Sequence, residues 1–61
     1  MKLFMLVFEY DGSTFAEFTD SYSEAKSKHQ DIECGMGVYC EVYRREYDEE
    51  LCGYEYKILF V

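Results

Sequence analysis

The sequence contains no proline, no tryptophan and only one histidine. It has no phosphate-binding glycine loop, no G-x-S-x-G and no H-E-x-x-H, so the common signatures of nucleotide, hydrolase and metalloprotease chemistry are missing. A chain of 61 residues also leaves little room for a cleft of the several hundred Å³ that a substrate needs. We therefore predict that the protein is not an enzyme and needs no cofactor.

Basic residues are scarce. Six lysines and arginines stand against thirteen acids, which gives a formal net charge of −7. Binding to phosphates requires Lys and Arg, so this balance argues against direct contact with nucleic acid or with an anionic membrane. No apolar run approaches the roughly 20 residues of a membrane span. The composition favours a basic protein as the partner.

The three cysteines form no C-x-x-C pair, and their odd number is typical of a reducing compartment. We therefore expect no disulfide and a cytoplasmic location, which would be the host cytoplasm if the protein is viral. An alternative is a zinc-binding module, because three thiolates and one imidazole are a set that suits zinc. The residues that would form it are His29, Cys34, Cys40 and Cys52.

The chain is predicted to form a single domain over residues 1–61, and a start at Met followed by a final strand predicts a complete small reading frame. Seven Tyr and five Phe supply large apolar area, which a chain this short needs for a core. The apolar opening, residues 1–8, superficially resembles a signal peptide. It lacks a small-residue cleavage site and is interrupted at residues 9–12, so a strand is the better interpretation.

The pattern predicts strands at residues 2–10 and 14–19, with a turn at Asp11-Gly12, then a helix, then a β-hairpin within residues 35–61. Residues 2–10 are apolar on both faces, which is typical of a central strand. The expected fold is α+β: a small antiparallel sheet of three or four strands in the order β-(β)-α-β-β, with one helix packed on one face.

The helix is expected over residues 22–34. Ser21 followed by Glu24 is a capping box, and Gly35 supplies a stop. Tyr22, Ala25, His29 and Ile32 recur at spacings of three and four, so they share the face that should meet the sheet.

The hairpin is predicted to close around a three-residue loop, Asp48–Glu50, with Tyr47 opposite Leu51. Alternation then separates two faces. The pairs expected on the buried face are Val38–Phe60, Cys40–Ile58, Val42–Tyr56 and Arg44–Tyr54, with Cys52 near the end of the same face. The pairs expected on the other face are Tyr39–Leu59, Glu41–Lys57 and Tyr43–Glu55.

A single helix can cover only one side of a sheet, so the other side is the candidate binding surface. Tyrosine offers a large rigid contact area with a hydroxyl, and acids around it speed encounter with a basic partner. The residues predicted to bind the partner are Tyr39, Glu41, Tyr43, Arg45, Glu46, Tyr47, Asp48, Glu49, Glu50 and Glu55. Leu3, Met5 and Val7 point to the same uncovered side and are candidates for self-association, unless the Phe15–Phe18 segment folds over them.

These observations predict a protein that binds, and inhibits or modulates, a basic protein, for example one that handles nucleic acid. Carboxylates two residues apart on a strand are about 6.5–7 Å apart, close to the spacing of backbone phosphates, so partial DNA mimicry is one form of this hypothesis. In its brevity, acidity and free cysteines the chain is similar to small proteins that bacteriophages make to disable host machinery, a likeness of general character that carries no site residue. The alternative is a small homo-oligomeric structural protein, for instance a homodimer.

Overall fold

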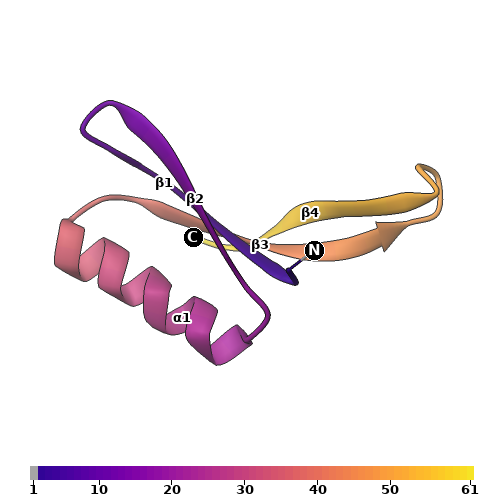
Figure 1. Cartoon of the computed structure of the whole chain (residues 1–61), viewed down its shortest axis with the longest axis horizontal. Coiled ribbons are helices and arrows are strands. Elements are labelled where there is room, and N and C mark those ends of the chain that lie inside the picture. Colours follow the sequence, from indigo (N-terminus) through magenta and orange to yellow (C-terminus); the bar gives the residue numbers. More distant parts are fainter. Residues whose placement is uncertain (1) are drawn as a thin grey trace.

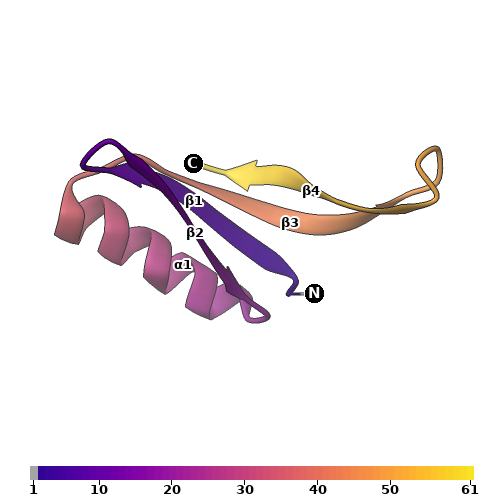
Figure 2. The same ribbon diagram turned by 45° about the horizontal axis from the view of Figure 1, so that its top comes forward.

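The computed structural model describes residues 2–61. Six elements follow one another along the chain. They are β1 (Phe4–Tyr10), β2 (Ser13–Thr19), α1 (Tyr22–Gln30), the π-helical turn η1 (Asp31–Met36), β3 (Cys40–Asp48) and β4 (Gly53–Phe60). The strands form one antiparallel sheet in the order β2-β1-β3-β4, with the helix on one side (Figures 1 and 2). The predicted α+β class is confirmed.

Strand β1 lies at the centre of the sheet, between β2 and β3, as its two apolar faces predict. It is joined to β2 by a tight turn in which Asp11 and Gly12 both have positive φ, 53° and 79°. Two positive φ angles are characteristic of the type I′ turn, whose twist matches that of the flanking strands. The predicted turn and second strand are therefore both present.

The helix begins where predicted. Ser21 is its N-cap, and the Ser21 hydroxyl accepts a hydrogen bond from the backbone N–H of Glu24 at 3.2 Å. At the other end the prediction was two residues short: the chain continues through Gly35 as the π-helical turn and stops at Gly37, which has φ 70°. Gly37 is therefore the residue that supplies the left-handed conformation of the C-cap. No helix within residues 2–61 has the length and apolarity needed to cross a membrane.

The core lies between this helix and the two central strands. Its buried members are Phe4, Leu6, Phe8, Ala25, Ile32, Cys40 and Val42. The predicted helix stripe is confirmed, because Ala25 and Ile32 are buried while Tyr22 packs on Phe4 at 5.8 Å between ring centroids. His29 lies edge-on to the ring of Phe60, at 5.1 Å.

The predicted hairpin register is wrong. The loop has four residues, Glu49–Cys52, and Asp48 pairs with Gly53. Asp48 Oδ1 accepts hydrogen bonds from the backbone N–H groups of Glu50 (2.9 Å) and Leu51 (3.4 Å). These bonds satisfy two backbone donors of the loop, and Cys52 supplies the left-handed residue of the turn with φ 51°.

One extra loop residue and a different starting pair shift every partner in β4. Tyr43 lies opposite Ile58, Arg45 opposite Tyr56 and Tyr47 opposite Tyr54. Alternation therefore moves three β4 side chains that were predicted to be buried, Tyr54, Tyr56 and Ile58, to the uncovered face. Ile58 is 56% exposed. Cys52 is likewise exposed in the loop, not in the core.

A β-bulge restores the end of β4 to the core. The register shifts between Val42 and Tyr43, so that Val42 pairs with Phe60 and Leu59 is the extra residue. Without the bulge, Leu59 would lie opposite Val42. With it, Phe60 points beneath the helix, where its ring meets those of Tyr22 and His29. Phe60 thus lies on the helix side of the sheet, as predicted, but it pairs with Val42 and not with Val38.

The register makes a direct prediction. Ile58→Lys should change the free energy of unfolding by less than about 0.5 kcal/mol, as for a surface substitution. Val42→Lys, which introduces the same side chain at a fully buried position in the neighbouring strand, should leave the protein unfolded because an unpaired buried charge costs several kcal/mol. Urea unfolding followed by circular dichroism measures both. Unfolding of the Ile58→Lys variant would contradict this register and favour the one in which Ile58 is buried.

Candidate functional site

The sheet face opposite the helix carries a continuous set of aromatic and aliphatic side chains. In Figures 1 and 2 the helix lies on one side of the sheet, and no other element of residues 2–61 covers the opposite side. We call this the open face. Strand alternation and pairing place on it Met5, Val7, Ala16, Phe18, Glu41, Tyr43, Arg45, Tyr47, Tyr54, Tyr56 and Ile58. Four β3 residues of the predicted binding surface, Glu41, Tyr43, Arg45 and Tyr47, therefore lie on this face, and β4 enlarges it.

The distal half of the β3–β4 hairpin extends beyond the helix and beyond β1 and β2, as both ribbon views show. We call residues 44–57 the hairpin arm; it begins at the last pair with β1, Arg44 opposite Phe4, and its distal part lies beyond that strand. None of its residues is buried, so neither of its faces contributes to the core. A two-stranded ribbon with both faces in water gains little stability for the fold itself.

The arm separates residues that the sequence had grouped into one surface. Arg45 and Tyr47 lie on the open face. Glu46, Asp48 and Glu55 share the opposite face with Arg44 and Lys57, because their positions in the strands have the other parity. Glu49 and Glu50 lie in the loop at the tip. The predicted partner-binding residues of the arm are thus divided between a tyrosine face and an acidic face of one ribbon, and the two faces meet at its tip.

Contacts between side chains order the open face of the arm. The rings of Tyr47 and Tyr54 meet edge to face at 5.4 Å between centroids. The Arg45 guanidinium lies 4.8 Å from the centroid of the Tyr54 ring, a cation–π distance. These contacts hold the aromatic groups in place without burying them: Tyr47 is 56% exposed and Tyr54 is 60% exposed.

Tyr56 connects the arm to the rest of the sheet. Its hydroxyl donates to the backbone carbonyl of Lys2 at 2.6 Å, and its ring lies 6.1 Å from that of Phe18. Phe18 therefore reaches the open face, whereas Phe15 stacks on Phe8 on the helix side. The 15–18 segment forms an edge strand and does not fold over the open face as internal cover.

The three residues considered for self-association do not stay together. Met5 and Val7 lie half-buried on the open face. Leu3 instead packs against the core. It precedes β1, in a bend where its N–H donates to Asp20 Oδ1 at 2.9 Å, so the strand alternation does not extend to it.

Charges around the surface have defined partners. The Tyr43 hydroxyl donates to Glu41 Oε1 at 3.1 Å, and this carboxylate raises the pKa of Tyr43. The backbone N–H groups of Leu51 and Glu50 lower the pKa of Asp48, so this carboxylate keeps its negative charge in mild acid. The predicted Glu41–Lys57 pair is not formed. Lys57 Nζ instead lies 3.5 Å from Glu55 and 3.9 Å from Asp48.

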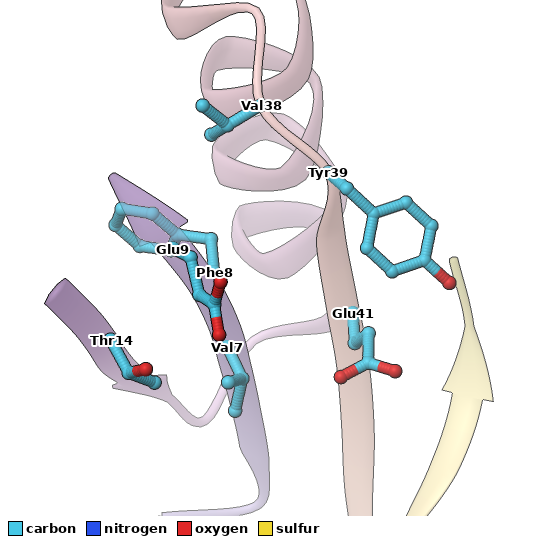
Figure 3. Close-up of a pocket in the computed structure, with 7 residues that line it drawn as sticks. All are labelled: Val7, Phe8, Glu9, Thr14, Val38, Tyr39 and Glu41. Carbon is cyan, nitrogen blue, oxygen red and sulfur yellow. The ribbon is translucent and has the colours of Figure 1, made fainter. Parts of the chain in front are cut away.

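A groove of about 510 Å³ opens where the β1–β3 ladder ends. The last pair of that ladder is Phe8 and Cys40, and the next residues on each strand, Glu9 and Tyr39, line the groove. Figure 3 shows Val7, Glu41 and Thr14 on three adjacent strands below them, with the Tyr39 ring and the Glu9 carboxylate nearer the open end. The sequence had placed Tyr39 and Glu41 in the binding set but had not singled out Glu9 or Thr14.

The cysteines and the histidine do not form a metal centre. Within residues 2–61 there is no group of three or more His, Cys, Asp or Glu side chains that could hold a metal ion. Cys52 is exposed in the loop between β3 and β4, Cys34 is exposed in η1, and Cys40 is buried at the start of β3. The fold therefore does not bring the residues of the zinc alternative together within residues 2–61.

His29 and Cys40 both approach Glu33. Glu33 Oε2 accepts a hydrogen bond from the backbone N–H of Cys40 at 3.2 Å. The same oxygen lies 3.1 Å from His29 Nε2, an ion-pair distance, but this nitrogen makes no hydrogen bond within the described chain. Burial, reinforced by the charges of Glu33, Glu17 and Glu41, raises the pKa of the Cys40 thiol to about 11. A thiol of this pKa stays protonated and behaves as a small apolar core group.

Comparison of the chain with protein-family models, with curated proteins and with solved structures gave no match.

The pKa of Cys40 predicts a pH dependence of stability. The folded-state pKa lies above the ordinary value of 9.0. The contribution of the protonated Cys40 thiol to the free energy of unfolding is therefore complete below about pH 9 and is lost as pH rises toward about 11. The unfolding free energy of Cys40→Ala should therefore fall less steeply between these pH values than that of the wild type. Both proteins have the same tyrosines, so tyrosine ionisation affects both curves. Urea unfolding at a series of pH values measures the difference. Parallel curves for the two proteins would show that Cys40 ionises equally in both states.

Proposed function

We propose that this protein binds a basic protein through the hairpin arm and the adjoining open face, and thereby modulates or inhibits it. The observation that carries the proposal is the arm itself: residues 44–57 form an ordered ribbon with no buried residue and with exposed tyrosines on one side. Exposed aromatic surface of this extent is characteristic of a protein–protein contact.

Charge supports a basic partner. The net charge of −7 is spread over the chain, and the arm has five acids against three basic residues. Glu49 and Glu50 lie at its tip, where a partner would meet them first. Acids in such a place raise the rate of encounter with a positive surface and set its orientation.

The chemistry of the surface favours particular classes of basic partner. A basic protein that handles nucleic acid has a positive groove of the required kind, and a host protein disabled by a phage-type inhibitor would be one example. Partial DNA mimicry is the least supported form. Glu46 and Glu55 face each other across the ribbon, but Lys57 lies among the same carboxylates and interrupts a phosphate-like row.

The test is capture of a partner from a bacterial lysate, followed by association kinetics over a range of salt concentrations. Glu46→Lys, Glu49→Lys and Glu50→Lys should each slow association severalfold and flatten its salt dependence. Asp31→Lys is the matched control, because it makes the same change of charge at an exposed position of the helix. Equal effects of all four substitutions would mean that only net charge matters and that the arm is not the contact.

Self-association through the open face is the second candidate, favoured by the aliphatic side chains Met5, Val7 and Ile58 that adjoin the tyrosines. Salt separates the two candidates. Binding of a basic partner weakens as salt rises, whereas a dimer of two chains of charge −7 strengthens because their repulsion is screened. Sedimentation at low and high salt measures the second effect. A protein that stays monomeric at both would exclude the homodimer.

A further inference from the structure

The groove at the end of the β1–β3 ladder combines an apolar floor with negative walls. Val7 lies at its base, and the carboxylates of Glu9 and Glu41 come from the two strands that diverge there (Figure 3). Tyr39 also lines the groove, and its side chain, 63% exposed, places its ring on the β4 side of β3 (Figure 3). A volume of about 510 Å³ falls within the range of about 300–1,000 Å³ that small-molecule sites occupy.

We infer that this groove receives an arginine side chain of the basic partner, an inference that rests on the proposed function. Arginine has a planar guanidinium that can stack on a tyrosine ring and donate two parallel hydrogen bonds to a carboxylate. Its three-carbon stem covers apolar surface such as that of Val7. Lysine offers a more strongly hydrated point charge, which gains less from the ring and cannot bind a carboxylate in a forked geometry.

A neighbouring side chain holds one wall of the groove in place. Glu41 accepts the Tyr43 hydroxyl through Oε1, which fixes the carboxylate and leaves Oε2 for a second donor. The groove is therefore complementary in charge to a cation and is held in shape by a neighbour.

The probe is Nα-acetyl-arginine amide, titrated into the ¹⁵N-labelled protein and followed by two-dimensional NMR. Saturable shifts should concentrate at residues 7–9 and 39–41. Blocked lysine should bind severalfold more weakly. Blocked citrulline, which keeps the shape of arginine without its charge, should cause no saturable shift. Shifts that map to the arm, or equal responses to arginine and citrulline, would overturn the inference.

Variants make the assignment specific. Glu41→Gln and Tyr39→Ala should each weaken arginine binding at least threefold, whereas Asp31→Asn should leave it unchanged. The amide spectrum of each variant shows whether the fold is kept, and Glu9→Gln provides a second substitution on the opposite wall. Unchanged arginine affinity in all three groove variants would contradict the site.

Arginine binding and partner association are measured separately, so the two hypotheses can fail independently. If arginine does not bind but the captured partner still depends on Glu49 and Glu50, the partner docks on the arm alone and the groove is not part of the contact. If arginine binds in the groove but association with the partner ignores the arm, the proposed binding mode is wrong and the groove stands as an independent site.

Discussion

The constraint on which this structure depends is the ratio of helix to sheet. One helix and its π-helical extension must cover a sheet of four strands, and they reach the two central strands, where Leu6 and Val42 are fully buried. Apolar burial stabilises the fold at roughly 25 cal/mol per Å², so stability concentrates in that small region. The opposite face and the hairpin arm remain available for contact because no second layer within residues 2–61 covers them.

The β-bulge reconciles this small core with the long hairpin. In the arm, pairing through Asp48 and Gly53 directs Tyr54 and Tyr56 to the open face. If that register continued unchanged, the helix would meet Leu59 opposite Val42. The extra residue reverses the alternation once, so that Phe60 closes the core beside His29 while the tyrosines stay outside. One irregularity thus lets a single strand serve the interior at one end and the surface at the other.

The sequence predicted what depends on local chemistry and on one element at a time. The Asp11-Gly12 turn, the Ser21 cap and the central position of β1 each follow from neighbouring residues. The position of Tyr43 on the open face follows from alternation within β3 alone. Predicting the face on which Ile58 lies requires the register between β3 and β4, and the four-residue loop determines that register. Two sequence features could have indicated the four-residue loop: Asp48, whose side chain accepts loop hydrogen bonds, and Gly53, the next paired residue. No sequence feature indicated the bulge at Leu59.

The central place of β1 also bears on how fast the molecule folds. Both hairpins join segments adjacent in the chain, so their closure is a local event of microseconds. The ladder between β1 and β3 joins residues distant in the sequence, such as Phe4 and Arg44, and its formation must bring together the two halves of the chain around the helix. Loop-closure entropy at that step sets the barrier, so this small domain should fold more slowly than a helical bundle of the same length.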